Sequence, residues 1–443
     1  MEQNESLEIE RIADAAHPSE PHLAVVDEDF SVLEDHQLAN HRRDVPINMR
    51  QSGDSNAKML ISTRVRKSPY WQRSERHGAY AYSVYNHMYH PRAYVRPEDG
   101  GLLKEYEYLT NDVTLWNVAV ERQIQIKGPD ALEFANLLVT REVNEETCPV
   151  FQARYVILCN QYGGIINDPI LLRIAEDEIW LSISDSDVCL WAQGVNFGAG
   201  YDVTISEIDV CPVQIQGPKS KALMEKLFGD MVNRIPYYNV APASLDGMDV
   251  IISRTGFSAE VGYEIYLRNA TAKADQLWDL LVYFGEEFNL QVIAPSHIRR
   301  LEAGILSYGQ DMDLETNPFE VGFDRHVHFG KHDFIGKQAL LEIKNRGLTR
   351  KLVGLRLEGK PIDWYITDFW PVKDVATAQS IGHVSSAFYS PKLGFNIALA
   401  MVQVDYAEDD TEVEVIRSDT RETVTAQVCR FPFFDPTKEL PKS

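Results

Sequence analysis

The sequence predicts an α+β fold, and three observations support this prediction. A strand followed by Gly-Pro and then an apolar-periodic helix occurs twice, over residues 123–139 and 213–229. Residues 151–170 read as two strands around a Gly163-Gly164 turn, and the end of the chain is rich in strand patterns. Because the chain has 443 residues, we expect two or three domains rather than one core.

The first 62 residues form an acidic and polar segment with only short apolar clusters. Such a segment cannot bury a core of its own. We therefore expect a peripheral N-terminal extension, partly disordered or wrapped on the body or on a second subunit. The sequence leaves open whether the protein is a homodimer.

The overall charge excludes two classes of partner. A formal net charge of −23 argues against a nucleic-acid partner and against an anionic membrane surface, since both require a basic footprint. The 5 cysteines show no C-x-x-C spacing, which favours reduced structural thiols. We see no signal peptide and no apolar run of spanning length, so we expect a cytoplasmic protein.

Tyrosines and histidines crowd residues 80–94, where Tyr82 and Tyr85 precede the H-x-x-H pair of His87 and His90. No further ligands at metal spacing accompany the histidines, so satisfied or packing histidines are favoured over a metal site. The aromatic side chains fit either a core or a pocket wall, and the pattern alone leaves both open.

Asp168 follows the Gly163-Gly164 turn and precedes Pro169, which cannot donate to a strand ladder. An Asp in this place is more often a turn cap than a catalytic group. The next strand leads into a helix that carries Trp191, with Asp185 and Asp187 near its start. Helix N-terminal donors there could hold a carboxylate, although an ordinary Asp N-cap is the simpler interpretation.

Residues 253–323 hold the most informative pattern, an alternating strand followed by a short helix and a long ordered loop. Glu264 lies in this strand, where a carboxylate is costly to bury without a partner. It is either the ion-pair partner of Arg254 or Arg268 or a fixed acceptor for the N–H groups of a ligand. Beyond the loop, we expect His326 and His328 on one face of a strand.

This stretch resembles the glycine-cleavage T-protein (aminomethyltransferase) superfamily of tetrahydrofolate-dependent one-carbon transferases. The residues that carry the resemblance are the G-Y-E element at Glu264 and the run R-L-E-A-x-x-x-x-Y-G-x-D-M…N-P-x-E-x-G from Arg300 to Gly322. A third match, G-x-V-x-S-x-x-x-S-P-x-L-G-x-x-I-A-L-A, covers residues 382–400. The resemblance extends over roughly residues 65–435.

The resemblance implies a folate-binding body built from two duplicated strand–helix units, plus a small C-terminal β-barrel. The implied domains are the extension over 1–62, a catalytic body of two intertwined subdomains over 63–345, and the barrel over 346–443. The implied co-substrate is tetrahydrofolate, with no metal and no flavin; no G-x-G-x-x-G follows a strand. The implied catalytic residue is Asp168, and the implied folate-binding residues are Glu264, Tyr155, Phe257 and Arg300. Because folate is anionic, local cations are needed, and the further candidates are Arg154, Arg254, Arg268 and Arg299.

Within the superfamily, the segments STRVRKSPY…YSVYNHM, LWNVAVERQIQIKGPDA and SISDSDVCLW look like the dimethylsulfoniopropionate (DMSP) demethylase branch. T-proteins carry an Arg shortly before R-L-E where this chain has Ser296, and D-V-S-H-M-G where it has Asn117 to Arg122. Phe257 stands where the sulfonium-handling relatives often have Trp. The implied reaction is methyl transfer from a sulfonium to N5 of tetrahydrofolate, in which aromatic faces hold the cation. The implied substrate-binding residues are Tyr82, Tyr85, Trp191, Tyr266 and Arg122, with Arg154 as the other candidate for the substrate's carboxylate.

Four alternatives retain folate binding but differ in the donor or in whether the protein is catalytic. The donor could be a methylated amine or a methoxylated aromatic acid, or the chain could be a true aminomethyltransferase, which Ser296 disfavours. A non-catalytic folate-binding protein is the alternative from another class, and the presence of Asp168 beside Glu264 argues against it. The expected partners are therefore tetrahydrofolate and a small methyl donor.

Overall fold

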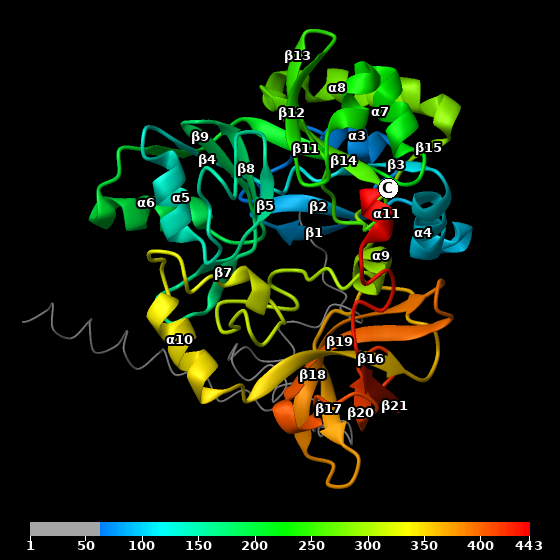
Figure 1. The fold of residues 1–443 in the computed structure, drawn as a ribbon. Helices are drawn as coiled ribbons and strands as arrows, with labels where there is room; N and C mark the ends of the chain where they lie inside the picture. The colour runs from blue at the N-terminus through cyan, green and yellow to red at the C-terminus, as the bar shows by residue number, and fades with distance from the viewer. Residues whose placement is uncertain (1–62) are drawn as a thin grey trace, which may run out of the picture.

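The computed structural model describes residues 63–443, so the predicted N-terminal extension lies outside the described part. Two β-sheets with helices on their outer sides form one part of the molecule, and a β-barrel forms the other (Figure 1). This arrangement confirms the predicted α+β class. Within residues 63–443, no helix is long and apolar enough to cross a membrane.

The first sheet has five strands in the order β10-β4-β9-β8-β5, and every pairing in it is antiparallel. Helices α5 (Ala131–Leu138) and α6 (Val188–Ala199) flank it (Figure 1). Ile126 and Phe134 belong to the core between β4 and α5. The strands are β4 (Gln123–Lys127), β5 (Ala153–Tyr155), β8 (Ile170–Ala175), β9 (Glu178–Ser182) and β10 (Thr204–Glu207).

The second sheet has six strands in the order β12-β13-β14-β11-β3-β15, with only β15 and β3 parallel among its pairs. Helices α7 (Ser220–Phe228) and α8 (Ala270–Gly285) cover one face, where Trp278 is fully buried. The strands are β3 (Val113–Asn117), β11 (Val210–Gln216), β12 (Val240–Leu245), β13 (Met248–Ser253), β14 (Gly262–Arg268) and β15 (Leu290–Val292).

The two strand–Gly-Pro–helix units form as expected, one in each sheet: β4 leads to α5, and β11 leads to α7. The glycine of each unit has a positive φ, 149° at Gly128 and 118° at Gly217. A Cβ at Gly128 would lie 2.2 Å from the carbonyl oxygen of Asp202, and one at Gly217 would lie 2.5 Å from that of Asp112. The same backbone constraint therefore selects glycine at both turns.

We expect Gly217→Ala to destabilise the protein by at least about 2 kcal/mol, because the new methyl meets backbone in a strained conformation. The matched control is Gly194→Ala within α6, where a Cβ meets nothing within 4 Å. Ala should leave stability unchanged there or raise it by up to about 1 kcal/mol. The two variants are compared by their midpoints of urea unfolding, which report stability when the m-values are equal. Equal midpoints would contradict the steric account.

The C-terminal part is a closed six-strand barrel in the order β16-β19-β18-β17-β20-β21. Closure leaves no unpaired edge strand, and Trp370 and Leu355 fill the interior. The strands are β16 (Arg350–Leu357), β17 (Trp370–Asp374), β18 (Ser380–Ser390), β19 (Phe395–Gln403), β20 (Glu412–Arg417) and β21 (Glu422–Cys429).

Smaller elements connect the sheets to the barrel. The predicted hairpin at Gly163-Gly164 is present as paired β6 and β7. The segment between α9 and η6 (Asp324–His326) contains no helix or strand, as expected for the long loop. The expected strand at His326 is wrong, because His326 lies in the 3-10 helix η6. The other elements are α3 (Trp71–Arg76), β1 (Ala81–Tyr85), β2 (Met88–Ala93), η3 (Pro97–Asp99), α4 (Gly101–Asn111), β6 (Leu158–Cys159), β7 (Ile165–Asn167), η4 (Gly229–Arg234), η5 (Glu286–Phe288), α9 (His297–Glu302), α10 (Lys337–Arg346), η7 (Val404–Tyr406) and α11 (Glu439–Lys442).

Candidate active site

A cavity of about 950 Å³ is lined by both sheets, the loop that follows α9, the start of the barrel and the C-terminal segment. Its size and its mixed lining suit a folate-sized ligand together with a small second substrate. Asp168 and Glu264, which lie 96 positions apart in the sequence (264 − 168), both line this cavity. The two carboxylates singled out in the sequence therefore belong to one site.

Asp168 lies between β7 and β8 and is only 8% exposed. Its Oδ2 accepts a hydrogen bond of 2.9 Å from the Tyr155 hydroxyl, and its Oδ1 accepts one of 2.6 Å from Ser184 Oγ. Burial raises the pKa of Asp168 from its ordinary value to about 6, while the two hydroxyl donors oppose that shift. The carboxylate is thus fixed in place and titrates near physiological pH.

Glu264 lies on β14 and is 3% exposed. Its carboxylate accepts hydrogen bonds from the Gln214 amide at 2.6 Å, the Tyr266 hydroxyl at 2.7 Å and the Thr255 hydroxyl at 2.5 Å. Burial raises the pKa of Glu264, and these three donors lower it. Because a carboxylate offers about four acceptor positions, a position remains for a ligand N–H.

Neither of the arginines proposed as partners for Glu264 pairs with it. Arg254 donates to the carbonyl oxygen of Pro441 at 2.9 Å, and its guanidinium stacks on Tyr263. Arg268 stacks on Trp180 and lies 3.9 Å from Glu178. The ion-pair interpretation of Glu264 is therefore wrong, because both guanidinium groups are engaged elsewhere.

Glu121 is an acid of this site that the sequence did not reveal. It lines the cavity, and its carboxylate accepts from Ser182 Oγ at 3.3 Å. Burial raises the pKa of Glu121 well above its ordinary value, and the charge of Glu264 raises it further. Burial and the neighbouring charge thus both favour the neutral form of Glu121. Its segment, N-V-A-V-E-R, has no periodicity that would single it out.

Three predicted site residues join the two acids on the cavity wall. Tyr155 contributes the hydroxyl that holds Asp168, and its ring packs edge-on against Phe323 at 5.6 Å. Phe257 packs edge-on against His297 at 6.2 Å. Tyr85, at the end of β1, also lines the cavity, and burial raises the pKa of its phenol. Aromatic side chains thus line the cavity together with the acids.

Arg300 was expected to bind folate, but it is fully buried and engaged in the protein's interior. It forms an ion pair of 2.6 Å with Asp311 and donates to Ser386 Oγ on β18 at 2.7 Å. Among the described residues that line the cavity, Arg300 is absent. We interpret it as a tie between α9 and the barrel, because a buried guanidinium needs a fixed carboxylate.

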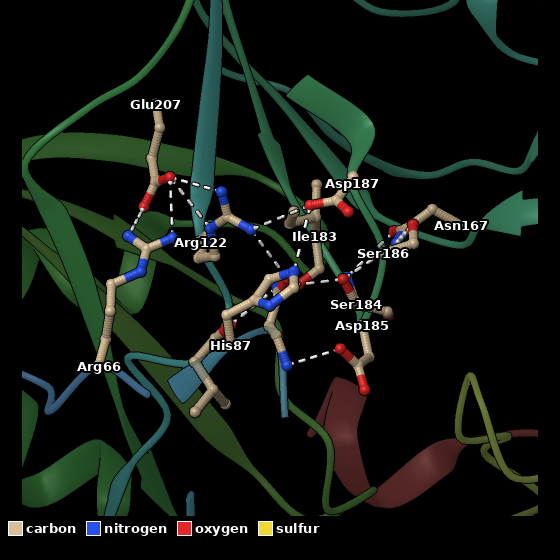
Figure 2. Close-up of polar contacts among 12 residues, drawn as sticks. Arg66, His87, Arg122, Asn167, Ile183, Ser184, Asp185, Ser186, Asp187 and Glu207 are labelled. Carbon is tan, nitrogen blue, oxygen red and sulfur yellow. Dashed lines mark hydrogen bonds and ion pairs between the residues drawn. The ribbon is translucent and has the colours of Figure 1, made fainter. Parts of the chain in front are cut away.

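Arg122 was expected to bind a substrate carboxylate, yet its charge is already compensated. Figure 2 shows its guanidinium pointing to Glu207 and Asp187, with Arg66 on the other side of Glu207. The ion pair with Glu207 measures 2.6 Å, and Arg66 pairs with the same glutamate at 2.6 Å. Arg122 is absent from the cavity lining within residues 63–443. Arg122 also donates to Oδ1 of Asn86 in the β1–β2 turn at 3.2 Å, so the network ties this turn to the first sheet.

The remaining three predicted residues also lie away from the cavity surface. Tyr82 packs against Trp71 with ring centroids 4.8 Å apart, and Trp191 packs on the core beneath α6. Tyr266 is fully buried behind Glu264 and donates to it. Tyr266 therefore positions an acid of the site instead of touching a donor.

The cavity carries basic side chains in a chain whose net charge is −23. Arg154, a predicted candidate, lines it together with Arg141, Arg325 and Lys438. Burial lowers the pKa of Arg141, and the charges of Arg154 and Arg325 lower it further. Such mutual repulsion favours an anion at this end of the cavity. The sequence missed the group because its members are scattered along the chain.

Residues 63–443 contain no group of three or more His, Cys, Asp or Glu side chains placed to hold a metal ion. His87 and His90, the H-x-x-H pair, point to different places. His87 is exposed and contacts Asp187 at 3.3 Å, whereas His90 is buried on the cavity wall. All 5 cysteines are free thiols.

Two family models match the chain in succession. The GCVT N-terminal domain matches residues 70–331, and the glycine cleavage T-protein C-terminal barrel domain matches residues 350–435. Among solved structures, aminomethyltransferase T of the glycine cleavage system from Bartonella henselae superposes with a TM-score of 0.73. That match has 23% identity and covers 84% of this chain and 99% of that one, and it supports the fold alone.

Two curated relatives match over most of their own length. Dimethylsulfoniopropionate demethylase DmdA of Ruegeria pomeroyi is 34% identical, over 84% of this chain and 98% of that protein. The aminomethyltransferase of Halothermothrix orenii is 32% identical, over 75% of this chain and 91% of that protein. With the family models covering both the sheets and the barrel, the chain belongs to the glycine cleavage T-protein (aminomethyltransferase) family.

Proposed function

We propose that this chain transfers a methyl group from a sulfonium donor of the DMSP type to N5 of tetrahydrofolate. The observation that carries the proposal is the single cavity in which two buried, hydroxyl-bound carboxylates face aromatic side chains. Family membership supports the general class of reaction, a tetrahydrofolate-dependent one-carbon transfer. The match to DmdA, which spans 98% of that protein, supports the sulfonium donor.

The residues of the cavity fit a reduced folate. Glu264 keeps a free acceptor position for the N–H groups of a pterin, and Glu121, whose neutral form is favoured by burial, can supply a donor beside it. Phe257 provides a flat apolar wall. The basic group of Arg141, Arg154, Arg325 and Lys438 suits the carboxylates of the folate glutamate.

In the reaction, a sulfur–methyl bond breaks as a nitrogen–methyl bond forms at N5, the sulfur leaves as a neutral thioether, and N5 loses a proton. Asp168 is the acid we assign to the reacting centre, because its charge can stabilise the positive charge that passes from sulfur to nitrogen. Tyr155 and Ser184 hold its two oxygens, so the charge needs no reorientation during transfer. Positioning supplies most of the remaining rate, on the order of 7–11 kcal/mol for well-oriented pairs.

A donor panel tests the proposal. Purified protein with tetrahydrofolate is incubated separately with DMSP, a methylated amine and a methoxylated aromatic acid, and the products are identified by mass spectrometry. We expect 5-methyltetrahydrofolate together with methylmercaptopropionate from DMSP alone. Methyl transfer only from the amine or the aromatic acid would replace DMSP as the proposed donor.

A further inference from the structure

A second polar group lines the cavity on the side of β2 and α9, apart from Asp168 and Glu264. Its members are Arg92 and His90 on β2 and His297, the first residue of α9. A β-bulge leaves Arg92 outside the regular pairing of β2 with β1, and both Arg92 and His90 line the cavity. Nothing in the reaction described above uses this group.

Arg92 has no carboxylate partner among residues 63–443. Its Nε donates to Ser83 Oγ at 2.7 Å, its Nη1 contacts His297 Nε2 at 2.6 Å, and its guanidinium lies 5.5 Å from the ring of Tyr365. These neutral contacts leave guanidinium N–H donors available to a ligand. Arg92 is half-buried on the cavity wall, and burial lowers the pKa of its guanidinium.

The four arginines that are fully buried among residues 63–443 have carboxylate partners, whereas Arg254, at 5% exposed, donates to a backbone carbonyl oxygen instead. Arg300 pairs with Asp311 at 2.6 Å and Arg417 with Asp419 at 2.6 Å. Arg173 and Arg299 follow the same rule, with Glu145 at 2.6 Å and Glu260 at 2.8 Å. Arg92 is less buried than these four and faces the cavity, but it has no such partner among the described residues. An anion in the cavity could therefore supply the carboxylate that the described chain does not.

The two histidines add hydrogen-bonding capacity to the same place. Each is 5% exposed, and burial together with the charge of Arg92 lowers both pKa values well below the ordinary range, so the rings are neutral. Since His297 Nε2 receives the Arg92 N–H, its proton must lie on Nδ1. That Nδ1 has no partner in the described part of the chain, and neither does Nδ1 of His90.

An aromatic wall runs from this group toward the reacting acid. His90 lies 6.0 Å from the ring of Tyr85, and the charge of Asp168 is among the causes that raise the pKa of that phenol. His297 packs edge-on against Phe257 at 6.2 Å and Tyr365 at 5.1 Å. A ligand held at Arg92 would therefore extend along Tyr85 toward Asp168.

We infer that Arg92 and His297, with His90 beside them, bind the anionic end of the methyl donor and so set the orientation of its cationic end toward Asp168. For a donor of the DMSP type, the anionic end is the carboxylate. This inference rests on the proposed function for the name of the donor, but the binding of a carboxylate can be measured without turnover. Arg122 was expected to bind the carboxylate of the donor, but its charge is compensated by Glu207. We assign that role to Arg92 instead.

The test compares Arg92→Met and Arg92→Lys with the wild type and with Arg234→Met, a control on an arginine 73% exposed on the outer surface. Calorimetry measures the Kd of methylmercaptopropionate, and initial rates give kcat/KM for DMSP and for trimethylsulfonium, which lacks a carboxylate. Loss of a charge-assisted pair predicts a roughly 10- to 100-fold rise in Kd for Arg92→Met. The kcat/KM for DMSP should fall by a similar factor, with that for trimethylsulfonium and the Kd of tetrahydrofolate unchanged. Arg92→Lys should recover part of the loss.

Two other outcomes would overturn the inference. An unchanged Kd for methylmercaptopropionate in Arg92→Met, in protein that still binds tetrahydrofolate normally, would overturn it. Equal losses for DMSP and trimethylsulfonium would do the same, because they would make Arg92 a scaffold residue. If the wild type binds methylmercaptopropionate but transfers no methyl from DMSP, the proposed function fails. The subsite then stands or falls on whether Arg92→Met abolishes that binding.

Discussion

Replacing Asp168 by Asn should lower kcat by about 10²- to 10³-fold, the usual effect of removing one preorganised electrostatic group from a reacting centre. The carboxylate is held by Tyr155 and Ser184 and lies where the methyl group is expected to pass. Burial of the charged form raises the pKa of Asp168 to about 6, so this charge lowers the stability of the folded state at neutral pH. The Asp168→Asn substitution should therefore not reduce the stability measured at pH 8.

The same substitution predicts a change in pH dependence. Asp168 has a raised pKa and acts as the charged form, so wild-type kcat/KM should fall as the pH drops through about 6. Asp168→Asn should lose this acidic limb, whereas Asp187→Asn, a control on a side chain 55% exposed, should retain it and the full rate. Equal losses of rate and stability in Asp168→Asn, with the acidic limb intact, would make Asp168 a structural turn residue.

Replacing Glu264 by Gln should raise the Kd of tetrahydrofolate by about 10- to 100-fold, because it removes the charge from the acceptor proposed for the pterin. The isosteric amide keeps the shape that Gln214, Thr255 and Tyr266 surround. Glu225→Gln, on the exposed side of α7, is the matched control and should bind tetrahydrofolate as the wild type does. Calorimetric titration measures all three proteins.

Glu121 provides a second readout for the Glu264 substitution. The charge of Glu264 is one cause of its raised pKa, so Glu264→Gln should lower the pKa of Glu121. A titration of carboxyl signals by NMR would detect this shift in the absence of folate. Unchanged folate affinity in Glu264→Gln, with the expected shift of Glu121 present, would remove Glu264 from the folate site while leaving the pairing of the two acids in place.

Much of the fold could be predicted from local patterns. The Gly-Pro turns at Gly128 and Gly217, the hairpin at Gly163-Gly164 and the long loop after α9 each have a short-range cause that the sequence displays. Glu264 stood out as an acid within an apolar strand, whereas Asp168 was assigned to the site by the family resemblance, because its pattern alone favoured a turn cap. His326 was misplaced, because alternation over a few residues does not distinguish a strand from a 3-10 turn.

The site was harder to predict because long-range pairing determines which charges are available. Arg122 and Arg300 looked like free cations, but Glu207 and Asp311 compensate them. Arg92 shows the opposite case, since only the fold reveals that no carboxylate in the described chain reaches it. Tyr266 was expected at the substrate, but the fold places its hydroxyl behind Glu264. The type of a residue is readable in the sequence, whereas its partner is a property of the fold.

A stoichiometric transfer with deuterium-labelled DMSP tests the central claim most directly. Purified protein is mixed with one equivalent each of tetrahydrofolate and DMSP, in which both sulfonium methyl groups are trideuterated. The masses of both products are then measured by mass spectrometry. We predict equimolar 5-methyltetrahydrofolate carrying one trideuteromethyl group and methylmercaptopropionate retaining the other. Tetrahydrofolate recovered without label, from protein that binds it normally, would contradict methyl transfer from the sulfonium.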